Sequence, residues 1–369
     1  MNRSPRRTLP STHSPSPIAS CANVLDFEAI ARSRMERAFY DYYAGGAEDE
    51  VTLAANRGAF AEVFLRPRVL VDVSRIETST TFLGISVSMP VVIAPTAFHR
   101  LAHPDGELAT AKAAGGARTL MVASTGSTYT LEEIARAASG PLWFQLYVYK
   151  DRSLARNLIQ RAERAGYKAL CLTVDTPRLG SRERDVRNQL VLPPGIEMRN
   201  LVEAGFDMSE TSLLAHRQLD CSLTWDAVAW LRSETKLPIL LKGILAAEDA
   251  ALAVQHGADG VIVSNHGGRQ LDGAEATLRA LPRVVDAVAG RAEVLMDGGV
   301  RRGTDVLKAL ALGARAVLVG RPCLWGLAAA GEEGVARVLE MFRQELMLAM
   351  ALCGCPEIGA VDRSLIASD

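Results

Sequence analysis

The sequence lacks long hydrophobic runs and any excess of charge of one sign. Its longest apolar run, near Met347 to Cys353, is far shorter than the roughly 20 residues that a membrane-spanning helix needs. The 41 Lys and Arg residues nearly balance the 42 Asp and Glu residues, which leaves a formal net charge of -1. A chain so close to neutrality has no electrostatic reason to bind nucleic acid or an anionic membrane surface. Neither kind of partner is therefore expected.

Metal-ligand spacing is also missing. Cys353 and Cys355 are separated by a single glycine, so they do not form a CxxC pair, and the other four cysteines are scattered. No metal site is expected, and reduced thiols in a cytoplasmic setting are the simplest interpretation.

The first 23 residues contain no acidic side chain and are rich in Ser, Pro and Arg. Such a composition is typical of transit peptides. However, four prolines interrupt any amphipathic helix, and no apolar signal-peptide core is present. We therefore expect residues 1–23 to form a disordered tail and residues 24–369 to form one domain.

The ordered chain is expected to begin with helices. Asp26 is a good N-cap for a helix from Phe27 to about Tyr43, which the following glycines would end. A second helix is predicted from about Glu48 to Phe64. The proline-containing, β-rich stretch 66–87 is then expected to form a hairpin-like cover.

From Pro90 onward, apolar strand-like runs alternate with helical patterns such as 246–256 and 303–312, each followed by glycine. Eight such units in about 250 residues predict a (β/α)₈ barrel, with a doubly wound sheet as the alternative. The eight runs are 91–94, 120–123, 142–145, 169–174, 238–242, 260–263, 293–297 and 316–319.

Polar residues follow nearly every one of these runs. In a barrel they would converge on one rim, where the active site of this architecture lies. They are Thr96 with Ala97, Ser124, Gln145 with Tyr147, Thr173 with Asp175, Lys242, the segment 264–272, Asp297 with Gly299, and Gly320 with Arg321.

The segment 264–272, Ser-Asn-His-Gly-Gly-Arg-Gln-Leu-Asp, carries the most distinctive chemistry. His266 can accept or donate a proton near neutral pH, and Arg269 can hold a carboxylate with its planar guanidinium group. The two glycines between them leave the backbone bare, so that a flat ligand can approach closely.

Two Gly/Arg pairs follow the seventh and eighth runs. Gly299 with Arg301, and Gly320 with Arg321, offer backbone N–H groups and guanidinium groups where barrels commonly hold a phosphate. Because Gln145, Thr173 and Lys242 can bond a polar ring, the expected ligand is a phosphorylated heterocycle.

Asp175 has two interpretations. Behind His266 it would fix the imidazole tautomer and favour the imidazolium that forms in catalysis. It could equally be a helix N-cap or an ion-pair partner.

Over residues 24–367 the chain resembles the family of FMN-dependent α-hydroxy acid oxidases and dehydrogenases, which includes glycolate oxidase. The motifs that carry the resemblance are Tyr40-Asp41-Tyr42-Tyr43, Ala94-Pro95-Thr96-Ala97, Gln145-Leu146-Tyr147, residues 173–178, residues 264–272 and residues 297–301.

The resemblance implies an FMN-holding barrel, a homotetramer or octamer, and oxidation of an L-2-hydroxy acid to a 2-oxo acid. It implies that His266 is the base and Asp175 its partner, that Arg182 and Arg269 hold the substrate carboxylate with Tyr42, and that Tyr147 bonds the substrate hydroxyl. Lys242 would lie beside the flavin ring, where a cation stabilises the reduced anionic form. The rest of the FMN site would comprise Thr96, Ala97, Ser124, Gln145, Thr173, Ser264, Asp297, Gly299, Arg301, Gly320 and Arg321.

Two departures from glycolate oxidase qualify the resemblance. Gly126 stands where that enzyme has a tryptophan beside the substrate, so larger substrates such as lactate or mandelate are expected, unless this glycine only serves a tight loop. The chain ends in Ile366-Ala367-Ser368-Asp369 and not in a peroxisomal Ser-Lys-Leu-like tail, which again favours the cytoplasm.

The stretch after the fourth run, about 178–223, is expected to form a mobile lid. Its charged residues, among them Glu197, Asp207 and Glu210, differ from the apolar insertion of a membrane-bound relative, so oxygen is the expected electron acceptor. A dehydrogenase with another acceptor is the alternative. The sequence leaves hydride and carbanion routes open.

Two rival functions use the same residues differently. A Schiff-base aldolase would use Lys242 as its nucleophile. A non-catalytic flavin- or phosphate-binding module would not need the set His266, Asp175 and Arg269.

Overall fold

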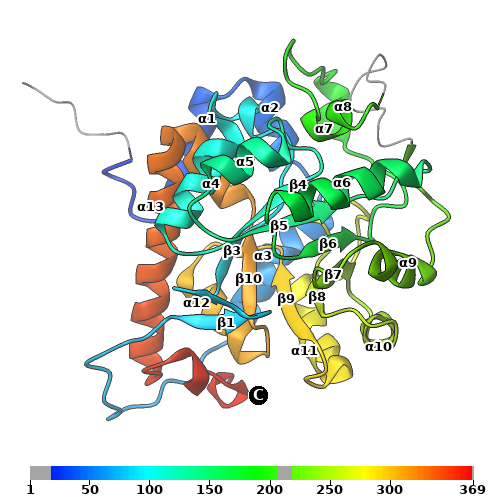
Figure 1. Ribbon diagram of the computed structural model, residues 1–369. Helices are drawn as coiled ribbons and strands as arrows, with labels where there is room; N and C mark the ends of the chain where they lie inside the picture. Colours follow the sequence, from blue (N-terminus) through cyan, green and yellow to red (C-terminus); the bar gives the residue numbers. More distant parts are fainter. Residues whose placement is uncertain (1–17, 207–217, 368–369) are drawn as a thin grey trace, which may run out of the picture.

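Eight parallel strands close into a barrel at the centre of the molecule (Figure 1). The computed structural model describes residues 18–206 and 218–367. Around the barrel the strand order is β10-β3-β4-β5-β6-β7-β8-β9, which confirms the predicted (β/α)₈ barrel and excludes the doubly wound sheet. The barrel strands are β3 (Val91–Ile93), β4 (Met121–Ser124), β5 (Leu142–Leu146), β6 (Leu170–Thr173), β7 (Ile239–Ile244), β8 (Gly260–Val263), β9 (Glu293–Asp297) and β10 (Ala316–Val319).

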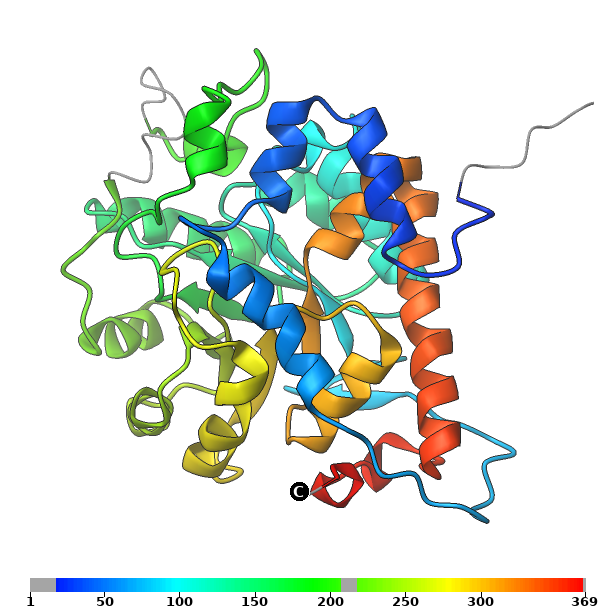
Figure 2. The same cartoon turned by 180° about the vertical axis from the view of Figure 1, so that it is seen from behind.

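Each barrel strand is followed by a helix that packs on the outside of the barrel (Figures 1 and 2), and two additional short helices lie between β6 and β7. α13 is long and kinked, because Ala330 and Gly331 leave the helical conformation. None of the helices in the described ranges is long and apolar enough to cross a membrane. The outer helices are α4 (Gly106–Gly116), α5 (Leu131–Ala137), α6 (Arg152–Arg164), α9 (Asp226–Glu234), α10 (Ala247–Gln255), α11 (Thr277–Val288), α12 (Gly303–Ala311) and α13 (Arg321–Cys353), with short 3₁₀ turns at η1 (His99–Leu101), η3 (Ile358–Ala360) and η4 (Arg363–Leu365).

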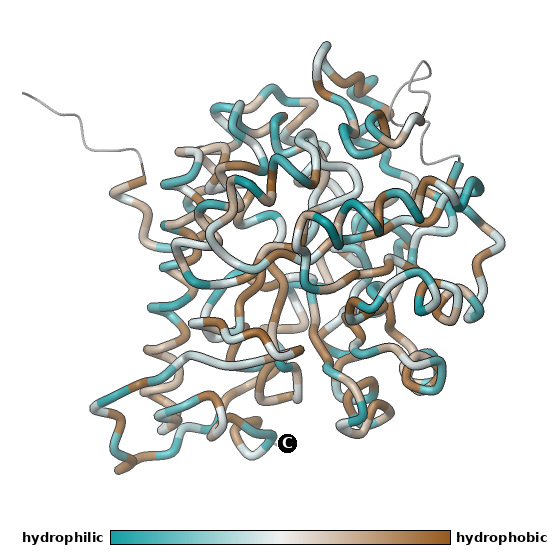
Figure 3. The backbone as a smooth tube through the Cα atoms, in the orientation of Figure 1, coloured by the Kyte–Doolittle hydropathy of each residue, from teal (hydrophilic) through white to brown (hydrophobic). Residues whose placement is uncertain are grey.

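Side chains alternate along each strand between the barrel interior and the outer helices. The lower interior is apolar, which Figure 3 shows as hydrophobic colour along the central strands. Its residues include Val92, Leu120, Val122, Trp143, Ala169, Cys171, Leu240, Ile262, Leu295 and Ala316. Two positions further along most of these strands, the next inward-facing residue is polar. These residues form a layer at the carboxyl ends of the strands: Ser124, Gln145, Thr173, Lys242, Ser264 and Asp297.

A hairpin covers the opposite end of the barrel. β1 (Thr80–Phe82) pairs antiparallel with β2 (Ile85–Val87), and the ring of Phe82 packs edge-on against Trp143 at a centroid distance of 5.7 Å. The prediction that residues 66–87 form a hairpin-like cover therefore included too many residues, because only residues 80–87 form the hairpin. Residues 66–79 contain no regular strand and are attached by an isolated bridge between Glu77 and Glu357.

Three helices precede the barrel: α1 (Asp26–Arg34), α2 (Arg37–Ala44) and α3 (Val51–Glu62). The prediction of a single helix to Tyr43 was wrong, because the chain becomes extended at Met35 and Glu36. No glycine or proline causes this break. It redirects α2 so that Tyr43 is buried and Tyr40 stacks on Trp325 at 5.2 Å, packing that outweighs the local helical preference.

The predicted boundary of the disordered tail at residue 23 also needs correction. Residues 1–17 lie outside the described part, but Ile18 and Cys21 are buried against the hydrophobic core. Apolar contact therefore orders the chain several residues before Val24.

The predicted lid after β6 contains secondary structure. It includes two short helices, α7 (Glu183–Arg187) and α8 (Arg199–Glu203), and an isolated bridge between Tyr149 and Leu219 joins its far end to the segment that follows β5. Residues 207–217 of this segment, with Asp207 and Glu210, lie outside the described residues. The mobility of the lid stays a prediction.

Candidate active site

A cavity opens at the carboxyl ends of the barrel strands. Together with its open mouth it encloses about 1110 Å³. All of the site residues predicted from the sequence line this cavity except Asp175 and Ser264, which lie directly behind it. The predicted residues that line the cavity are Tyr42, Thr96, Ala97, Ser124, Gly126, Gln145, Tyr147, Thr173, Arg182, Lys242, His266, Arg269, Asp297, Gly299, Arg301, Gly320 and Arg321.

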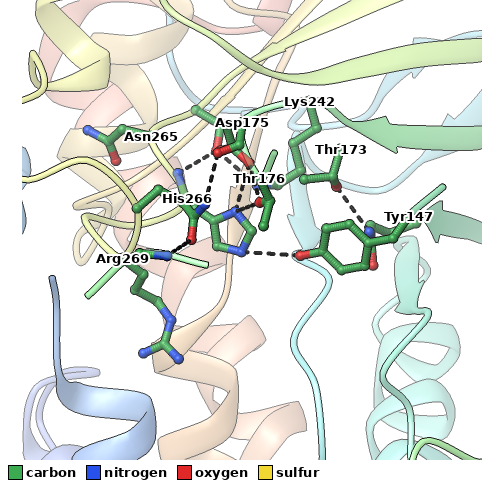
Figure 4. A network of polar contacts seen from close by, with 12 residues as sticks. Tyr147, Thr173, Asp175, Thr176, Lys242, Asn265, His266 and Arg269 are labelled. Carbon is green, nitrogen blue, oxygen red and sulfur yellow. Dashed lines mark hydrogen bonds and ion pairs between the residues drawn. The ribbon is translucent and has the colours of Figure 1, made fainter. Parts of the chain in front are cut away.

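His266 contacts Asp175 through one ring nitrogen and faces Tyr147 with the other (Figure 4). Its Nδ1 atom lies 2.9 Å from Asp175 Oδ1, whereas Nε2 lies 3.5 Å from the Tyr147 hydroxyl. A carboxylate accepts a hydrogen bond, so Nδ1 carries the proton and Nε2 keeps its lone pair. Of the two interpretations of Asp175, the structure therefore supports the contact with His266.

Gly243 makes this contact possible. It lies in β7, between the strands that carry Asp175 and His266, and has a φ of +113°. A Cβ atom at this position would lie 2.6 Å from the Cβ of Asp175. Glycine is required both for the backbone conformation and for the close approach of the carboxylate.

Burial and charge adjust this pair in opposite ways. Burial lowers the pKa of His266, and Asp175 only partly reverses this, so the imidazole is neutral at neutral pH and can accept a proton. Burial alone would raise the pKa of Asp175, but His266 and Lys242 outweigh it and lower that pKa. Asp175 is therefore ionised beside a neutral base.

Two arginines, Arg182 and Arg269, line the cavity near Tyr42 of α2. Arg269 donates to the backbone carbonyls of Tyr42 and Gly45, and its guanidinium carbon lies 5.0 Å from the centre of the Tyr42 ring. Burial, with Arg269 nearby, lowers the pKa of Arg182 to about 10. The negative charge of Asp185 acts on both arginines, although it forms no ion pair within 4.0 Å with either of them in the described part of the chain. Two neighbouring guanidinium groups in the cavity wall favour an anionic ligand.

Hydrogen bonds link the polar layer at the strand ends into two groups. The amide of Gln145 accepts from Ser124 Oγ at 3.2 Å and donates to Thr173 Oγ1 at 3.0 Å. Lys242 Nζ donates to Ser264 Oγ at 2.9 Å and lies 3.1 Å from Asp297 Oδ2. Burial would lower the pKa of Lys242, but Asp297 and Asp175 outweigh it and raise that pKa, so this lysine stays charged.

The far end of the cavity is strongly cationic. Burial, reinforced by Arg57, lowers the pKa of Arg301 to about 10, and burial with Arg269 and Arg301 lowers that of Arg321 further. Arg321 donates to the carbonyls of Tyr43 and Gly267 from the first residue of α13. Phosphates bind readily at such helix N-termini.

Two buried polar atoms in the cavity wall lack hydrogen-bond partners among the described residues, and a cofactor could supply them. Arg301 Nε and Asp297 Oδ1 are buried without hydrogen-bond partners among the described residues, and both side chains line the cavity. A phosphorylated ligand with hydroxyl groups would satisfy both. The residues present therefore fit FMN, whereas residues 18–206 and 218–367 contain no cluster of His, Cys, Asp and Glu suited to a metal.

Some lining residues were not predicted from the sequence. They include Tyr149, Met198 and Leu324. Of these, Met198 is near Gly126, because the backbone N–H of the next residue, Arg199, donates to the carbonyl of Ser127. Tyr149 could have been found, because it follows Tyr147 by two residues, the spacing that keeps extended side chains on one side. Met198 comes from the lid, where no motif marks it.

Comparisons with known proteins agree with this geometry. The family model described as FMN-dependent dehydrogenase matches residues 31–368. The chain is 54% identical to glycolate oxidase of Spinacia oleracea, over 94% of this chain and 96% of that protein. It is 53% identical to L-lactate oxidase of Nostoc sp., over 95% and 99%. A crystal structure of mandelate oxidase with (S)-2-phenylpropionate has a TM-score of 0.86 and 43% identity, over 95% and 99%.

Proposed function

The chain belongs to the family of FMN-dependent dehydrogenases, and we propose that it oxidises L-2-hydroxy acids to 2-oxo acids with oxygen as electron acceptor. FMN supplies the redox chemistry by accepting the two electrons that leave the substrate. The observation that carries the proposal is the His266–Asp175 pair at the wall of a cavity that Arg182 and Arg269 also line.

His266 is the proposed base. Its Nε2 accepts either the hydroxyl proton, while the Cα hydrogen leaves as hydride, or the Cα proton itself. Both routes need the same neutral imidazole in the same place. Asp175 stabilises the imidazolium that forms, as orienting carboxylates do in related catalytic sets.

Arg182 and Arg269 are the proposed carboxylate clamp, and Tyr42 forms the wall beside it. Burial, with the negative charge of Asp175, raises the pKa of Tyr147 to about 12, so its phenol stays protonated. It can therefore donate a hydrogen bond to the substrate hydroxyl, next to His266.

The remaining lining residues are proposed to hold FMN. Arg301, Arg321, Gly299 and Gly320 suit its phosphate, and the buried charge of Lys242 suits its reduced, anionic ring. The ring and its polyol chain would be held by Thr96, Ala97, Ser124, Gln145, Thr173, Ser264 and Asp297.

The Schiff-base alternative is disfavoured by the state of Lys242. A nucleophilic lysine must lose its proton, yet Asp297 lies 3.1 Å from the ammonium group, and the pKa of Lys242 is raised.

The described part of the lid supports oxygen as the acceptor. Arg199 on α8 forms ion pairs with Glu197 and Glu203 at 2.9 and 2.6 Å. This charged, partly exposed segment stands where a membrane-bound relative would need an apolar insertion. A homotetrameric or octameric assembly and a cytoplasmic location follow from the resemblance and from composition alone, and they stay predictions.

The wall beside Gly126 supports substrates larger than glycolate. No side chain fills the cavity at this position, and Met198 of the lid lines the same cavity close by. A bulkier substrate group placed there would be removed from water and would gain about 25 cal/mol for each Å² of apolar surface buried. Lactate, mandelate and long aliphatic 2-hydroxy acids are therefore the proposed substrates.

Oxygen uptake by the purified yellow protein tests the proposal. With L-mandelate or L-lactate we expect one hydrogen peroxide and one 2-oxo acid for each oxygen consumed. Turnover only with an added quinone or dye would replace oxygen by another acceptor. No turnover of any 2-hydroxy acid with either kind of acceptor would overturn the function.

A further inference from the structure

The side chains of Asn56 and Asn265 form a reciprocal pair of amide hydrogen bonds. Asn56 Nδ2 donates to Asn265 Oδ1, and Asn265 Nδ2 donates to Asn56 Oδ1, both at 2.8 Å. The two residues are 209 positions apart, and their exposed fractions are only 2% and 4%. α3, one of the three helices that precede the barrel, is thereby bonded to the residue that directly precedes His266.

The backbone after Asn265 is held in an unusual conformation. His266, Gly267 and Gly268 have φ values of +59°, +66° and +74°. The two glycines adopt this region readily, but a histidine does so only where its surroundings enforce it. His266 is thus a strained residue at the point where the proposed chemistry takes place.

The side chain of Asn265 helps to hold His266 in this conformation. Asn265 Oδ1 also accepts from Gly268 N at 3.1 Å, and Asn265 Nδ2 also donates to Glu275 O at 3.0 Å. The same side chain therefore bonds the far end of the left-handed turn and the chain beyond it. Figure 4 shows Asn265 beside His266, with the imidazole directed toward Tyr147.

Asn56 is itself fixed from several sides. Its Oδ1 accepts from Thr277 N at 3.3 Å, and its backbone lies so close to Gly299 that a Cβ there would be 2.1 Å from Asn56 O. Asn56 therefore cannot shift to follow a moving loop, and it provides a rigid attachment point for Asn265.

We propose that Asn56 is a positioning residue for the base: by pairing with Asn265 it holds His266 in the left-handed conformation that directs Nε2 at the substrate. The inference rests on the proposed function, because it assumes that His266 removes a proton. Asp175 fixes the ring at its Nδ1 side, and the amide pair fixes the backbone that carries the ring.

Loss of the amide pair should therefore slow the reaction without weakening substrate binding. Without the pair, the backbone of His266 can relax, and a misplaced base slows proton removal by roughly 10- to 100-fold. The carboxylate clamp has other supports, since Arg269 is bonded to the carbonyls of Tyr42 and Gly45 and Arg182 precedes α7. The dissociation constant of the hydroxy acid should therefore change little.

Stopped-flow reduction of the FMN-loaded protein under anaerobic conditions, with L-mandelate or L-lactate, tests this expectation in Asn56→Ala. We expect the limiting rate of flavin reduction to fall by roughly 10- to 100-fold, with FMN retained. The matched control is Thr52→Val. Thr52 lies one turn earlier on α3, is equally buried, and donates to Ala274 O at 3.0 Å, away from His266. It should lose stability but keep its reduction rate.

A double-mutant cycle with Asn265→Ala adds a second test. If the two amides act as one unit, the double variant is no slower than the slower single variant. Multiplicative losses would overturn the proposal, as would an unchanged rate in Asn56→Ala, an equal slowing in Thr52→Val, or a loss confined to substrate affinity.

The experiment also gives a clear result if the Asn56 variants do not fold. If Asn56→Ala does not fold, Asn56→Ser is measured in the same way, and failure of both would make the pair a scaffold contact and overturn the positioning role. If the wild-type flavin is not reduced by any hydroxy acid, it is the proposed function that fails. If the wild type is reduced and Asn56→Ala keeps pace with it, only this inference fails.

Discussion

His266 Nδ1 lies 2.9 Å from Asp175 Oδ1, although the residues are 91 positions apart. They are carried at the ends of β8 and β6, on either side of β7, and Gly243 in β7 leaves the space for them to meet. The carboxylate orients the imidazole and fixes its proton on Nδ1. This contact supports the proposal that His266 acts as a base and is not an incidental loop histidine.

Replacing Asp175 with Asn should therefore damage catalysis without emptying the site. An amide can present its N–H to Nδ1 and so favour the wrong tautomer. We expect anaerobic flavin reduction to slow by roughly 10²–10⁴-fold, while the FMN spectrum of the purified variant stays normal. A variant that reduces its flavin at nearly the wild-type rate would show that the contact has no catalytic role.

The pH dependence of kcat/KM should show an acid limb at low pH. His266 must be neutral to accept a proton, so activity falls as the pH drops through its pKa. Because burial lowers that pKa more than Asp175 raises it, the limb should lie below about 6.5, the ordinary pKa of histidine.

Asp175→Asn should move this limb to still lower pH, since the charge that favoured the imidazolium is gone. Profiles of wild type and variant, measured in parallel, check the sign. A limb that moved upward, or a wild-type limb above the ordinary histidine value, would contradict the assignment of the base.

The carboxylate clamp predicts that charge alone is insufficient. Arg182→Lys and Arg269→Lys keep the positive charge but lose the planar pair of donors, so kcat/KM for hydroxy acids should fall by roughly 10-fold or more. The same variants should differ much less from wild type with the methyl esters, which lack the carboxylate. An equal loss with acid and ester would refute the clamp.

The substrate-size prediction concerns Gly126, and the structure refines its test. A Cβ at this position would lie 2.9 Å from the Cβ of Ala97, so Gly126→Trp requires a local shift as well as filling the cavity. Met198→Trp is therefore the companion variant, since it narrows another wall of the same space.

Wild type should prefer L-lactate and L-mandelate to glycolate in kcat/KM. Both variants should lose the large acids, by an amount that follows the apolar area no longer buried, about 25 cal/mol per Å², and should keep glycolate. An unchanged ranking in folded, yellow variants would assign Gly126 to a tight loop and leave specificity to the lid.

The barrel was predictable from the sequence because its strands are short, buried and rich in β-branched residues. The inward layer at their carboxyl ends was predictable for a related reason. Residues such as Gln145 and Lys242 continue a two-residue alternation that is otherwise apolar, and the fold brings all such ends to one rim.

Features that depend on tertiary packing were missed. The break at Met35 and Glu36 has no local signal and follows from the packing of the tyrosines of α2. Asn56 had a weak signal, since it lies on the buried face of α3 with Thr52, Ala59 and Phe60, where an apolar residue is expected. Its partner, 209 positions away, could not be inferred from periodicity.

Anaerobic reduction of the flavin in wild type and His266→Gln, followed side by side in the visible spectrum, tests the central claim most directly. Because the proposed phosphate and ring contacts are made by other residues, both proteins should be purified yellow. The account predicts rapid bleaching of the wild type by L-mandelate or L-lactate, and bleaching slower by at least roughly 10²-fold in the variant. Equal bleaching of the two proteins, or none in the wild type with any 2-hydroxy acid, would contradict it.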